Sequence, residues 1–458
     1  MPRILPAGDD SRSVEAIISE LARVSVTAAH ARRRLGLVLA SYVIVLTLVM
    51  TLLPFDFQSP DRWRMVGYAG IQDLIVNLAL FIPIGFFCRF ARIGREDRWA
   101  MAALFGGLAL SGVIELLQVF EPVRSPSLLD VGLNGLGAWA GAFLYDAARR
   151  ALDQQERRIG VLALDLPLVG MLYLLIPLLW LAGLTRPDGP GGGVLELLPG
   201  FTGAVIFAAI DRHHLRAERR IPWWAAPAAA SAWFALGIVP TWRGSPSALV
   251  AAILGLGIVT ALFSRILFEV DPANRRYERV TLGRALPSLI VYIGLLHLWP
   301  LEQLSWSWTA RFAFNPTASR LSDLPILSLI GLISAFSVLG YAIAEARGRR
   351  GESTMVGSIN VLGLGLLGAT LLGAARGFHP LYGLSVAEVL LAAPATMVGA
   401  AVYWLTRGYV RSLVKERELV AALGDATAPV TVSSPGRAVP TGYHSADTAR
   451  QLTHRISR

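Results

Sequence analysis

The sequence is poor in cysteine, in charged residues and in known catalytic motifs. Its 458 residues include one cysteine, Cys88, so an intrachain disulfide is excluded. Charged residues make up only 16% of the composition. No CxxC pair, HExxH zinc motif, P-loop or GxSxG nucleophile motif occurs. We therefore predict no bound cofactor and no metal site, and the sequence does not identify a catalytic residue.

Hydrophobic residues dominate the chain instead. They account for 54% of it, and apolar runs long enough to cross a hydrocarbon core of roughly 30 Å recur along its whole length. Inside a bilayer the backbone must satisfy its own hydrogen bonds, which limits a spanning segment to a helix or a closed barrel. The runs are rich in Leu, Ala and Gly and lack the alternation of a strand. The predicted fold is an all-α, polytopic transmembrane bundle.

The apolar runs predict about twelve spans. They cover approximately residues 35–53, 73–90, 100–120, 128–147, 163–184, 194–210, 223–239, 248–268, 285–300, 324–345, 355–375 and 384–405. The sixth and seventh spans are short and interrupted by Gly or Pro. Losing one of them would invert the orientation of every later span.

The basic residues predict how these spans are oriented. With a cytoplasmic N-terminus, most of the 42 Lys and Arg residues fall on the inner segments, including Arg32, Arg92 and Arg149. This bias follows the positive-inside rule and makes both termini of the multi-pass protein cytoplasmic. It also explains the net charge of +10 as a topology signal. Without a basic groove interleaved with aromatics, a nucleic-acid partner is not expected.

The spans are flanked by two polar segments. Residues 1–34 are predicted to be a cytoplasmic N-terminal segment, in which residues 13–34 are a candidate amphipathic surface helix. Residues 413–458 are rich in Ser, Thr, Pro and Gly toward their end. That composition is typical of a disordered tail, here expected to be cytoplasmic.

Part of the sequence recurs within the chain. The segment 124–143 resembles the segment 243–263, and Phe120, Tyr145 and Arg149 match residues at a constant offset further on, in a third segment. We therefore predict three parallel four-helix units. They cover residues 35–150, 151–284 and 285–412, the second and third being degenerate copies.

The copies share small residues and turns but differ in their polar residues. Glu115, Gln118, Asp130 and Asn134 of the first unit lie in apolar surroundings, where polar groups are costly. The matching positions of the third unit are Gly373, Arg376, Glu388 and Ala392. If the alignment holds, the polar set is not needed to pack a unit. A second outer site formed by His379, Tyr382, Arg376 and Glu388 is a weaker alternative.

At these residues the chain resembles the VanZ-like family of bacterial membrane proteins. The resemblance covers approximately residues 40–147. It rests on Leu52–Phe55, Asn77, Phe81–Gly85, Glu115–Gln118, Arg124, Asp130, Asn134 and the small-residue run Gly135, Gly137 and Gly141. Ser127 departs from the pattern, because many members carry an acidic residue there.

The resemblance implies a role in the cell envelope, at the inner membrane of a bacterium. The family's namesake is an accessory factor in resistance to the glycopeptide teicoplanin, so a link to antibiotic resistance is an expectation. The resemblance implies no established reaction.

The predicted topology gathers a candidate ligand-binding site at the outer-leaflet level. It comprises Asp73, Asn77, Glu115, Gln118, Arg124, Asp130 and Asn134. Residues three or four apart share a helix face, so three polar faces are expected to converge. Arg124 would pair with a carboxylate or bind phosphate bidentately, and Pro83 would kink the second span nearby. Interhelical hydrogen bonding without a ligand is the alternative reading.

Three functions fit this site. The first is binding or handling of an envelope lipid head group, a prenyl-phosphate carrier or a glycopeptide-like ligand. The second is an intramembrane enzyme that uses Glu115 or Asp130 as a general base on an envelope lipid, with or without help from a divalent cation. The third is a structural partner in an envelope complex. Because no nucleophile, histidine or metal motif accompanies the carboxylates, binding is favoured over catalysis, with membrane lipids as the expected partners.

Overall fold

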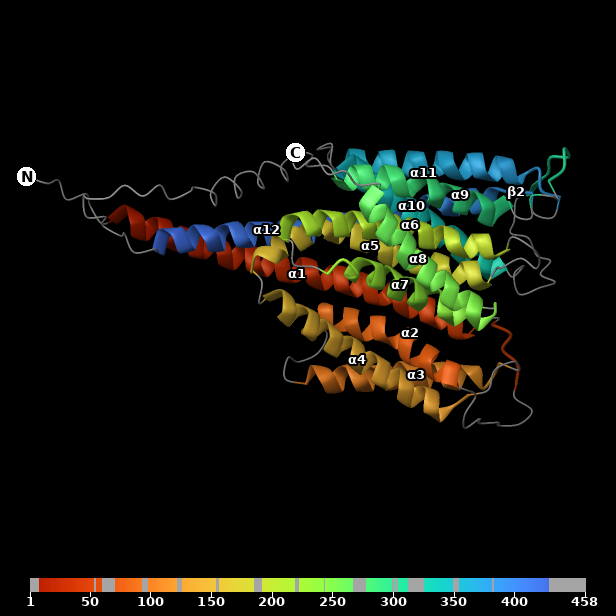
Figure 1. The fold of residues 1–458 in the computed structure, drawn as a ribbon, viewed down its shortest axis with the longest axis horizontal. Coiled ribbons are helices and arrows are strands. Elements are labelled where there is room, and N and C mark those ends of the chain that lie inside the picture. Colours follow the sequence, from red (N-terminus) through yellow and green to blue (C-terminus); the bar gives the residue numbers. More distant parts are fainter. Residues whose placement is uncertain are drawn as a thin grey trace, which may run out of the picture.

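A computed structural model gives the fold of the chain. It describes residues 8–52, 55–59, 71–92, 98–121, 126–153, 156–184, 192–218, 222–242, 244–266, 277–298, 301, 304–311, 325–348, 354–380 and 383–427. These residues form twelve α-helices, one 3-10 turn and one pair of very short strands (Figure 1).

The helices account for almost all of the regular structure. Their bounds are α1 (Gly8–Leu52), α2 (Ile71–Phe90), α3 (Trp99–Gln118), α4 (Leu128–Asp153), α5 (Glu156–Leu184), α6 (Gly192–Glu218), α7 (Ala225–Ile238), α8 (Pro246–Ile266), α9 (Tyr277–Leu298), α10 (Pro325–Gly348), α11 (Thr354–Arg376) and α12 (Val386–Thr427). The 3-10 turn η1 is Val239–Thr241. The strands β1 (Ala310–Arg311) and β2 (Leu384–Ser385) pair in parallel.

A helix lies at each of the twelve predicted spans, which confirms the all-α bundle. Seven of the described helices are long and apolar enough to cross a membrane: α1, α3, α8, α9, α10, α11 and α12. Shorter apolar stretches occur in α2, α5 and α7. The chain is therefore a multi-pass membrane protein, and the count of twelve crossings stays a prediction.

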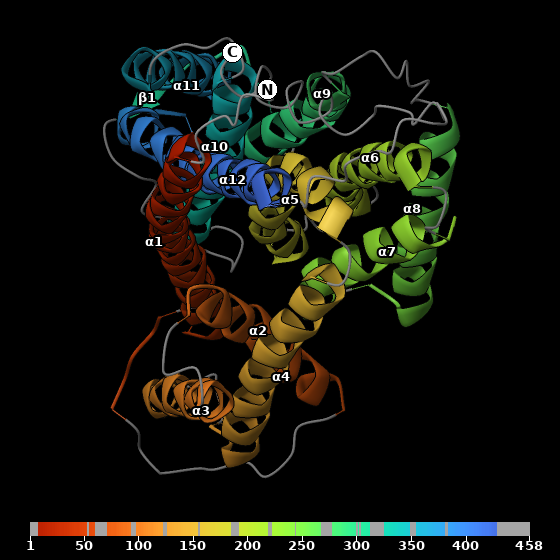
Figure 2. The same ribbon diagram turned by 90° about the vertical axis from the view of Figure 1, so that its left-hand side faces the viewer.

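Three groups of helices share one packing pattern. In each group two helices pack against a third that follows them in the chain: α2 and α3 on α4, α6 and α7 on α8, and α10 and α11 on α12. Figure 2, which looks along the long axis of the molecule, shows the α2–α4 group set apart below α1. These groups are the last three helices of each predicted unit.

The first helix of each predicted unit packs across a unit boundary. Helix α1 contacts α12 extensively, α5 contacts α10, and α9 contacts α6. Helix α1 also contacts α2 and so connects the α2–α4 group to the rest of the bundle. The units therefore do not pack as separate four-helix bodies.

Helices α1 and α12 project together beyond the bundle as a two-helix stalk (Figure 1). The 45 residues of α1 span about 67 Å at 1.5 Å per residue, more than twice the thickness of a hydrocarbon core. The candidate surface helix of residues 13–34 is continuous with the first span and packs on α12 instead of standing alone. Helix α12 also continues past residue 413, the expected start of the tail, to Thr427.

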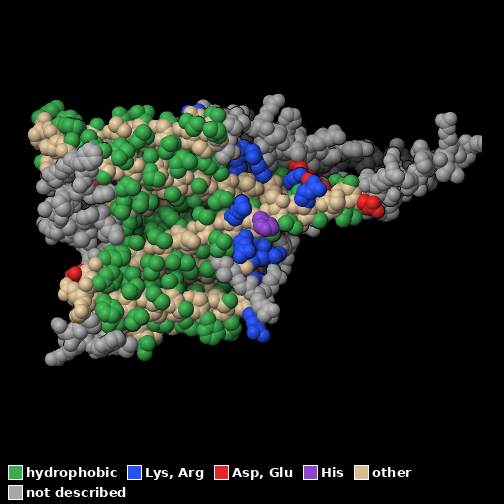
Figure 3. Space-filling model, turned by 180° about the vertical axis from the view of Figure 1, so that it is seen from behind, with side chains coloured by type: hydrophobic (Ala, Val, Ile, Leu, Met, Phe, Trp, Pro, Cys, Tyr) green, Lys and Arg blue, Asp and Glu red, His purple; other side chains and the backbone are tan. Residues whose placement is uncertain are grey.

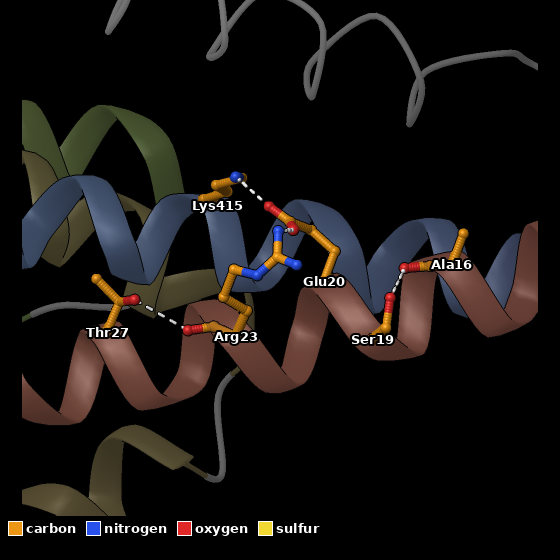
Figure 4. A network of polar contacts seen from close by, with 6 residues as sticks. All are labelled: Ala16, Ser19, Glu20, Arg23, Thr27 and Lys415. Atoms are coloured by element: carbon orange, nitrogen blue, oxygen red, sulfur yellow. Dashed lines mark hydrogen bonds and ion pairs between the residues drawn. The ribbon is translucent and has the colours of Figure 1, made fainter.

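Polar contacts join the two helices of the stalk. Lys415 Nζ lies 2.5 Å from Glu20 Oε1, and Arg23 Nη1 lies 2.9 Å from Glu20 Oε2 (Figure 4). The Lys415 hydrogen bond and charge lower the pKa of the Glu20 carboxyl below its ordinary value. The stalk therefore carries its own charge pairing outside the apolar body.

The surface of the bundle is divided between hydrophobic and basic regions. Hydrophobic side chains cover the body, and Lys and Arg side chains gather at the end from which the stalk projects (Figure 3). Large apolar residues face outward along α8 and α11, as lipid-facing helices require. The basic end is the one that the positive-inside rule assigns to the cytoplasm.

The first and third groups share contacts at the offset of the predicted repeat. Gly107 packs against Ala138, and the matching Gly365 packs against Thr396. The carbonyl of Phe120 accepts the Gln58 N–H at 2.7 Å, and that of the matching residue, Phe378, accepts the Ser305 N–H at 2.9 Å. These shared contacts are what a repeat would produce, and the triplication itself stays a prediction.

Candidate functional site

Close helix packing brings the candidate site together. Helices α2 and α4 touch through glycine: a Cβ atom on Gly141 would lie 1.9 Å from the Ile82 carbonyl oxygen. A Cβ atom on Gly85 would lie 1.8 Å from the Ala138 carbonyl oxygen. No larger residue fits at these separations, so the small-residue run of α4 sets the distance between the helices that carry the polar side chains.

Glu115 and Gln118 bind backbone groups at the end of the domain opposite the stalk, the outer end in the predicted orientation. The Ser127 N–H, just before α4, donates to Glu115 Oε2 at 2.6 Å. Gln118 Nε2 donates to the Thr51 carbonyl at 2.8 Å, near the end of α1. A carboxylate is stabilised at a helix N-terminus and a donor at a helix C-terminus, because each complements the partial charge there. The two side chains thus join α3 to α4 and to α1.

Asn134 lies deeper in the domain. Its Nδ2 donates to Ser111 Oγ at 2.8 Å, and both side chains are buried. At 1.5 Å per residue this pair sits about 9–11 Å along the helices from the C-terminal end of α3 and the N-terminal end of α4. Asn134 Oδ1 is buried and accepts no hydrogen bond in the described part of the chain.

The structure describes only some of the other predicted site residues. Asp130 lies in the first turn of α4, close enough for its charge to act on Glu115. Asn77 is half-buried on α2. Arg124 and the side chain of Asp73 lie outside the described residues. The structure therefore brings Glu115 near Asp130 and connects Gln118 and Asn134 to neighbouring helices.

Glu121 is a candidate site residue that the sequence analysis missed. Its side chain is 1% exposed, and neither carboxylate oxygen has a hydrogen-bond partner in the described part of the chain. The signal was present, because Glu115, Gln118 and Glu121 are spaced at intervals of three. An apolar environment makes a buried carboxylate without a partner expensive, so this group points to a missing donor.

The end of the domain nearer the stalk is held together by a charge cluster of another kind. Arg89 Nε donates to both oxygens of Asp146 at 2.9 and 3.1 Å, joining α2 to α4. The Arg89 guanidinium also lies over the Trp99 ring at the start of α3, 4.9 Å from its centroid. One arginine thus holds three helices at the end opposite the candidate site.

In the third helix group, an ion pair occupies the position that corresponds to the candidate site. Arg376 donates to Glu388, and these residues match Gln118 and Asp130 of the first group. The Glu388 N–H donates to Ser385 Oγ at 3.3 Å. The adjoining cavity is about 20 Å³, room for a single water. His379 is buried nearby, while Tyr382 lies outside the described residues.

The carboxylates of the first group are not gathered as metal ligands. Among the described residues, no three His, Cys, Asp or Glu side chains lie together in a metal-binding arrangement. Glu115 and Asp130 supply charge from α3 and α4, and the described contacts of Glu115 and Gln118 are to backbone. The site as described offers hydrogen-bond acceptors more than donors.

Comparison with known families matches the region that holds this site. Residues 24–149 match the model of the VanZ/LLP1 family. This segment is a VanZ-like domain. It contains the membrane part of α1 together with α2, α3 and most of α4, close to the predicted residues 40–147. No curated protein and no solved structure matches the chain.

The VanZ-like domain therefore carries all seven predicted site residues and Glu121. Its boundaries leave the α5–α12 part of the chain outside the family match. The chain is a multi-pass membrane protein that carries a VanZ-like domain, and α1, the first helix of that domain, is also half of the stalk.

Proposed function

We propose that the VanZ-like domain binds the polar head group of an envelope lipid or a glycopeptide-like ligand at its outer end. The proposal includes the predicted orientation, with the stalk in the cytoplasm of a bacterial cell and the site at the outer leaflet of its inner membrane. The function is binding or handling of the ligand, without a chemical step.

One observation carries the proposal: the buried carboxylate of Glu121 has no hydrogen-bond partner among the described residues. Leaving a charged acceptor unpaired costs more than a typical hydrogen bond contributes, about 1–3 kcal/mol or more. A ligand that donates hydrogen bonds would recover this cost. Asn134 Oδ1 offers a second buried acceptor deeper in the same domain.

The acceptors define the chemistry of the ligand. Sugar hydroxyls, amides and ammonium groups donate hydrogen bonds and match the carboxylates of Glu115, Glu121 and Asp130. Phosphate, which only accepts when ionised, would need a cation, and Arg124 is the predicted one. A glycosylated or amine-bearing head group thus fits the described acceptors, and a prenyl phosphate would fit through Arg124.

Lipids that copurify with the protein test the proposal. Native mass spectrometry would compare wild type with Glu121→Gln and Glu115→Gln. We expect a glycosylated or amine-bearing lipid in wild type and its loss in Glu121→Gln, because a neutral amide lacks the charge that holds the donor. Glu388→Gln in the third group is the matched control and should retain the lipid. Identical lipid profiles in wild type and Glu121→Gln would contradict the proposal.

A further inference from the structure

The lipid-facing side of α3 ends in an exposed aromatic residue. The exposed positions along α3 recur every three or four residues and so form one stripe: Met101, Phe105, Ala109, Val113, Leu116 and Phe120. The 20 residues of α3, Trp99–Gln118, span about 30 Å, the thickness of a hydrocarbon core. Phe120 follows the helix by two residues, so we expect it at the boundary between hydrocarbon and head groups.

Helix α11 repeats this stripe at the offset of the predicted repeat. Its exposed positions are the counterparts of those in α3: Ile359, Gly363, Leu367, Leu371, Ala374 and Phe378. Trp308 lies over the end of the stripe, because its indole N–H donates to the Ala374 carbonyl at 3.1 Å. A tryptophan with its ring beside an apolar face and its N–H bonded is typical of a membrane interface.

Two loops bring further aromatic side chains to these boundaries. Each loop follows the first helix of its predicted unit, α1 or α9, and its backbone binds the last residue of a stripe. The N–H groups of Gln58 and Ser305 donate to the carbonyls of Phe120 and Phe378, at 2.7 and 2.9 Å. An exposed aromatic residue adjoins each donor, and these two residues are Phe57 and Trp306.

Backbone contacts hold the loop that contains Trp306. The Thr309 N–H donates to the Gly377 carbonyl at 2.8 Å, and the Leu384 N–H donates to the Thr309 carbonyl at 2.9 Å. The strands β1 and β2 pair directly beside these bonds. The side chain of Trp306 is nevertheless 97% exposed. A bonded loop that presents a fully exposed tryptophan points to a contact outside the chain.

Both boundaries lie at the end of the molecule away from the stalk. Strand β2, which follows the turn at Phe378, lies at that end (Figure 1). Gln58 follows α1 and so lies past the end of this helix opposite the stalk. Lipid contacts the two stripes up to these ends. The rings beside them therefore reach the layer in which head groups meet hydrocarbon, where aromatic side chains are enriched.

We propose that four exposed aromatic residues insert into the head-group layer of the bilayer opposite the stalk: Phe57, Phe120, Trp306 and Phe378. This aromatic collar fixes the depth of the VanZ-like domain and of the third helix group at one level. Because Glu121 directly follows Phe120 and is buried, its carboxylate lies at head-group depth. A membrane lipid is then the ligand of the outer site. That last assignment rests on the proposed function, whereas the collar does not.

Fluorescence quenching tests the collar with the tryptophan in place. The protein would be reconstituted in phosphatidylcholine brominated either near the glycerol end or near the middle of one acyl chain. The difference between wild type and Trp306→Leu gives the signal of Trp306. We expect roughly twofold stronger quenching by the shallow bromine than by the deep one, as an interfacial ring requires.

Trp139 is the matched control, because it is exposed near the middle of α4. The signal lost in Trp139→Leu should be quenched more by the deep bromine. Quenching of Trp306 by aqueous iodide instead of by either lipid would place the ring in water. Shielding from all three quenchers would mean that another protein surface covers it. Either result would overturn the collar.

Spin labels test the part of the collar on the VanZ-like domain. In a Cys88→Ser background, a nitroxide would be attached at Phe57→Cys, at Leu116→Cys on the lipid-facing stripe and at Ala422→Cys on the stalk. We expect the ratio of oxygen to nickel-complex accessibility at Phe57 to lie between the other two. A ratio equal to that of Ala422 would place the loop in water and overturn the proposal. Glu121→Gln should leave both measurements unchanged, so its effect on copurifying lipid bears only on the proposed function.

Discussion

At the scale of single residues, the polar side chains of the VanZ-like domain divide by their partners. Glu115 and Gln118 bind backbone groups of α4 and α1, and such contacts stabilise the packing whether or not a ligand is present. Glu121 and the Oδ1 atom of Asn134 are buried acceptors without a described donor. These buried acceptors are the better candidates for ligand recognition. The free-energy cost of burying them is recovered only when a ligand donates a hydrogen bond.

In the stalk, an ion pair between Lys415 and Glu20 joins α12 to α1. We predict that Lys415→Gln raises the pKa of Glu20 toward its ordinary value of 4.5, because the lysine supplies both the hydrogen bond and the charge that lower it. Since the folded pKa is depressed, the contribution of the pair is present at neutral pH and is lost as the pH falls below 4.5 through the folded pKa. Carboxyl carbon NMR of isotope-labelled protein measures the shift. An unchanged Glu20 titration in Lys415→Gln would contradict the pairing.

At the scale of helices, glycine contacts decide how close α4 comes to its neighbours. Gly141 meets the backbone of α2, whereas a Cβ atom on Gly132 of the same helix would meet nothing within 4 Å. The same helix therefore has one face that requires glycine and one that tolerates a side chain. Gly107 and Gly135 make the corresponding close contacts between α3 and α4, which the hydrogen bond from Asn134 to Ser111 crosses.

This difference predicts opposite effects of two alanine substitutions. Gly141→Ala should lower the stability of the domain by about 1–3 kcal/mol, because the added methyl overlaps the Ile82 carbonyl. Gly132→Ala should be neutral or stabilise by roughly 0.5–1 kcal/mol, because a Cβ atom there meets no neighbour and alanine favours the helix. Thermal unfolding in detergent compares the two. Equal effects of both substitutions would contradict the described packing.

At the scale of the whole molecule, the first helix packs along the last one. Helix α1 belongs to the VanZ-like domain, yet it packs along α12 and forms the stalk with it. The α2–α4 group therefore depends on helices that follow it by more than two hundred residues. This arrangement makes the stalk the connection between the domain and the cytoplasmic side in the predicted orientation.

Cysteine labelling tests that orientation. Since Cys88 is the single cysteine, Cys88→Ser gives a background in which one new cysteine can be placed at a time. We expect a membrane-impermeant maleimide to label Ser59→Cys in intact spheroplasts and to label Ala422→Cys only after permeabilisation. Both positions are exposed, one between α1 and α2 and one on the stalk. The reverse pattern would contradict the predicted topology.

The helical architecture and the location of the domain were predictable from the sequence. Apolar runs fixed where helices occur, because a lipid-exposed backbone has few alternatives. The motif around Glu115 and Asn134 identified the VanZ-like region, which the family match confirmed. Glu121 was overlooked because the sequence predicts that a single acidic residue beside a loop is exposed to solvent. Its burial comes from tertiary contacts, which the local sequence does not show.

The sequence by itself determined an all-α multi-pass membrane protein with a VanZ-like domain, because hydrophobicity and small-residue patterns act locally along each helix. Only the tertiary structure decided that α1 and α12 form one stalk. It also decided which polar atoms find donors, with Gln118 reaching Thr51 and Glu121 left buried. Those outcomes depend on contacts between residues far apart in the chain, and no local pattern encodes them.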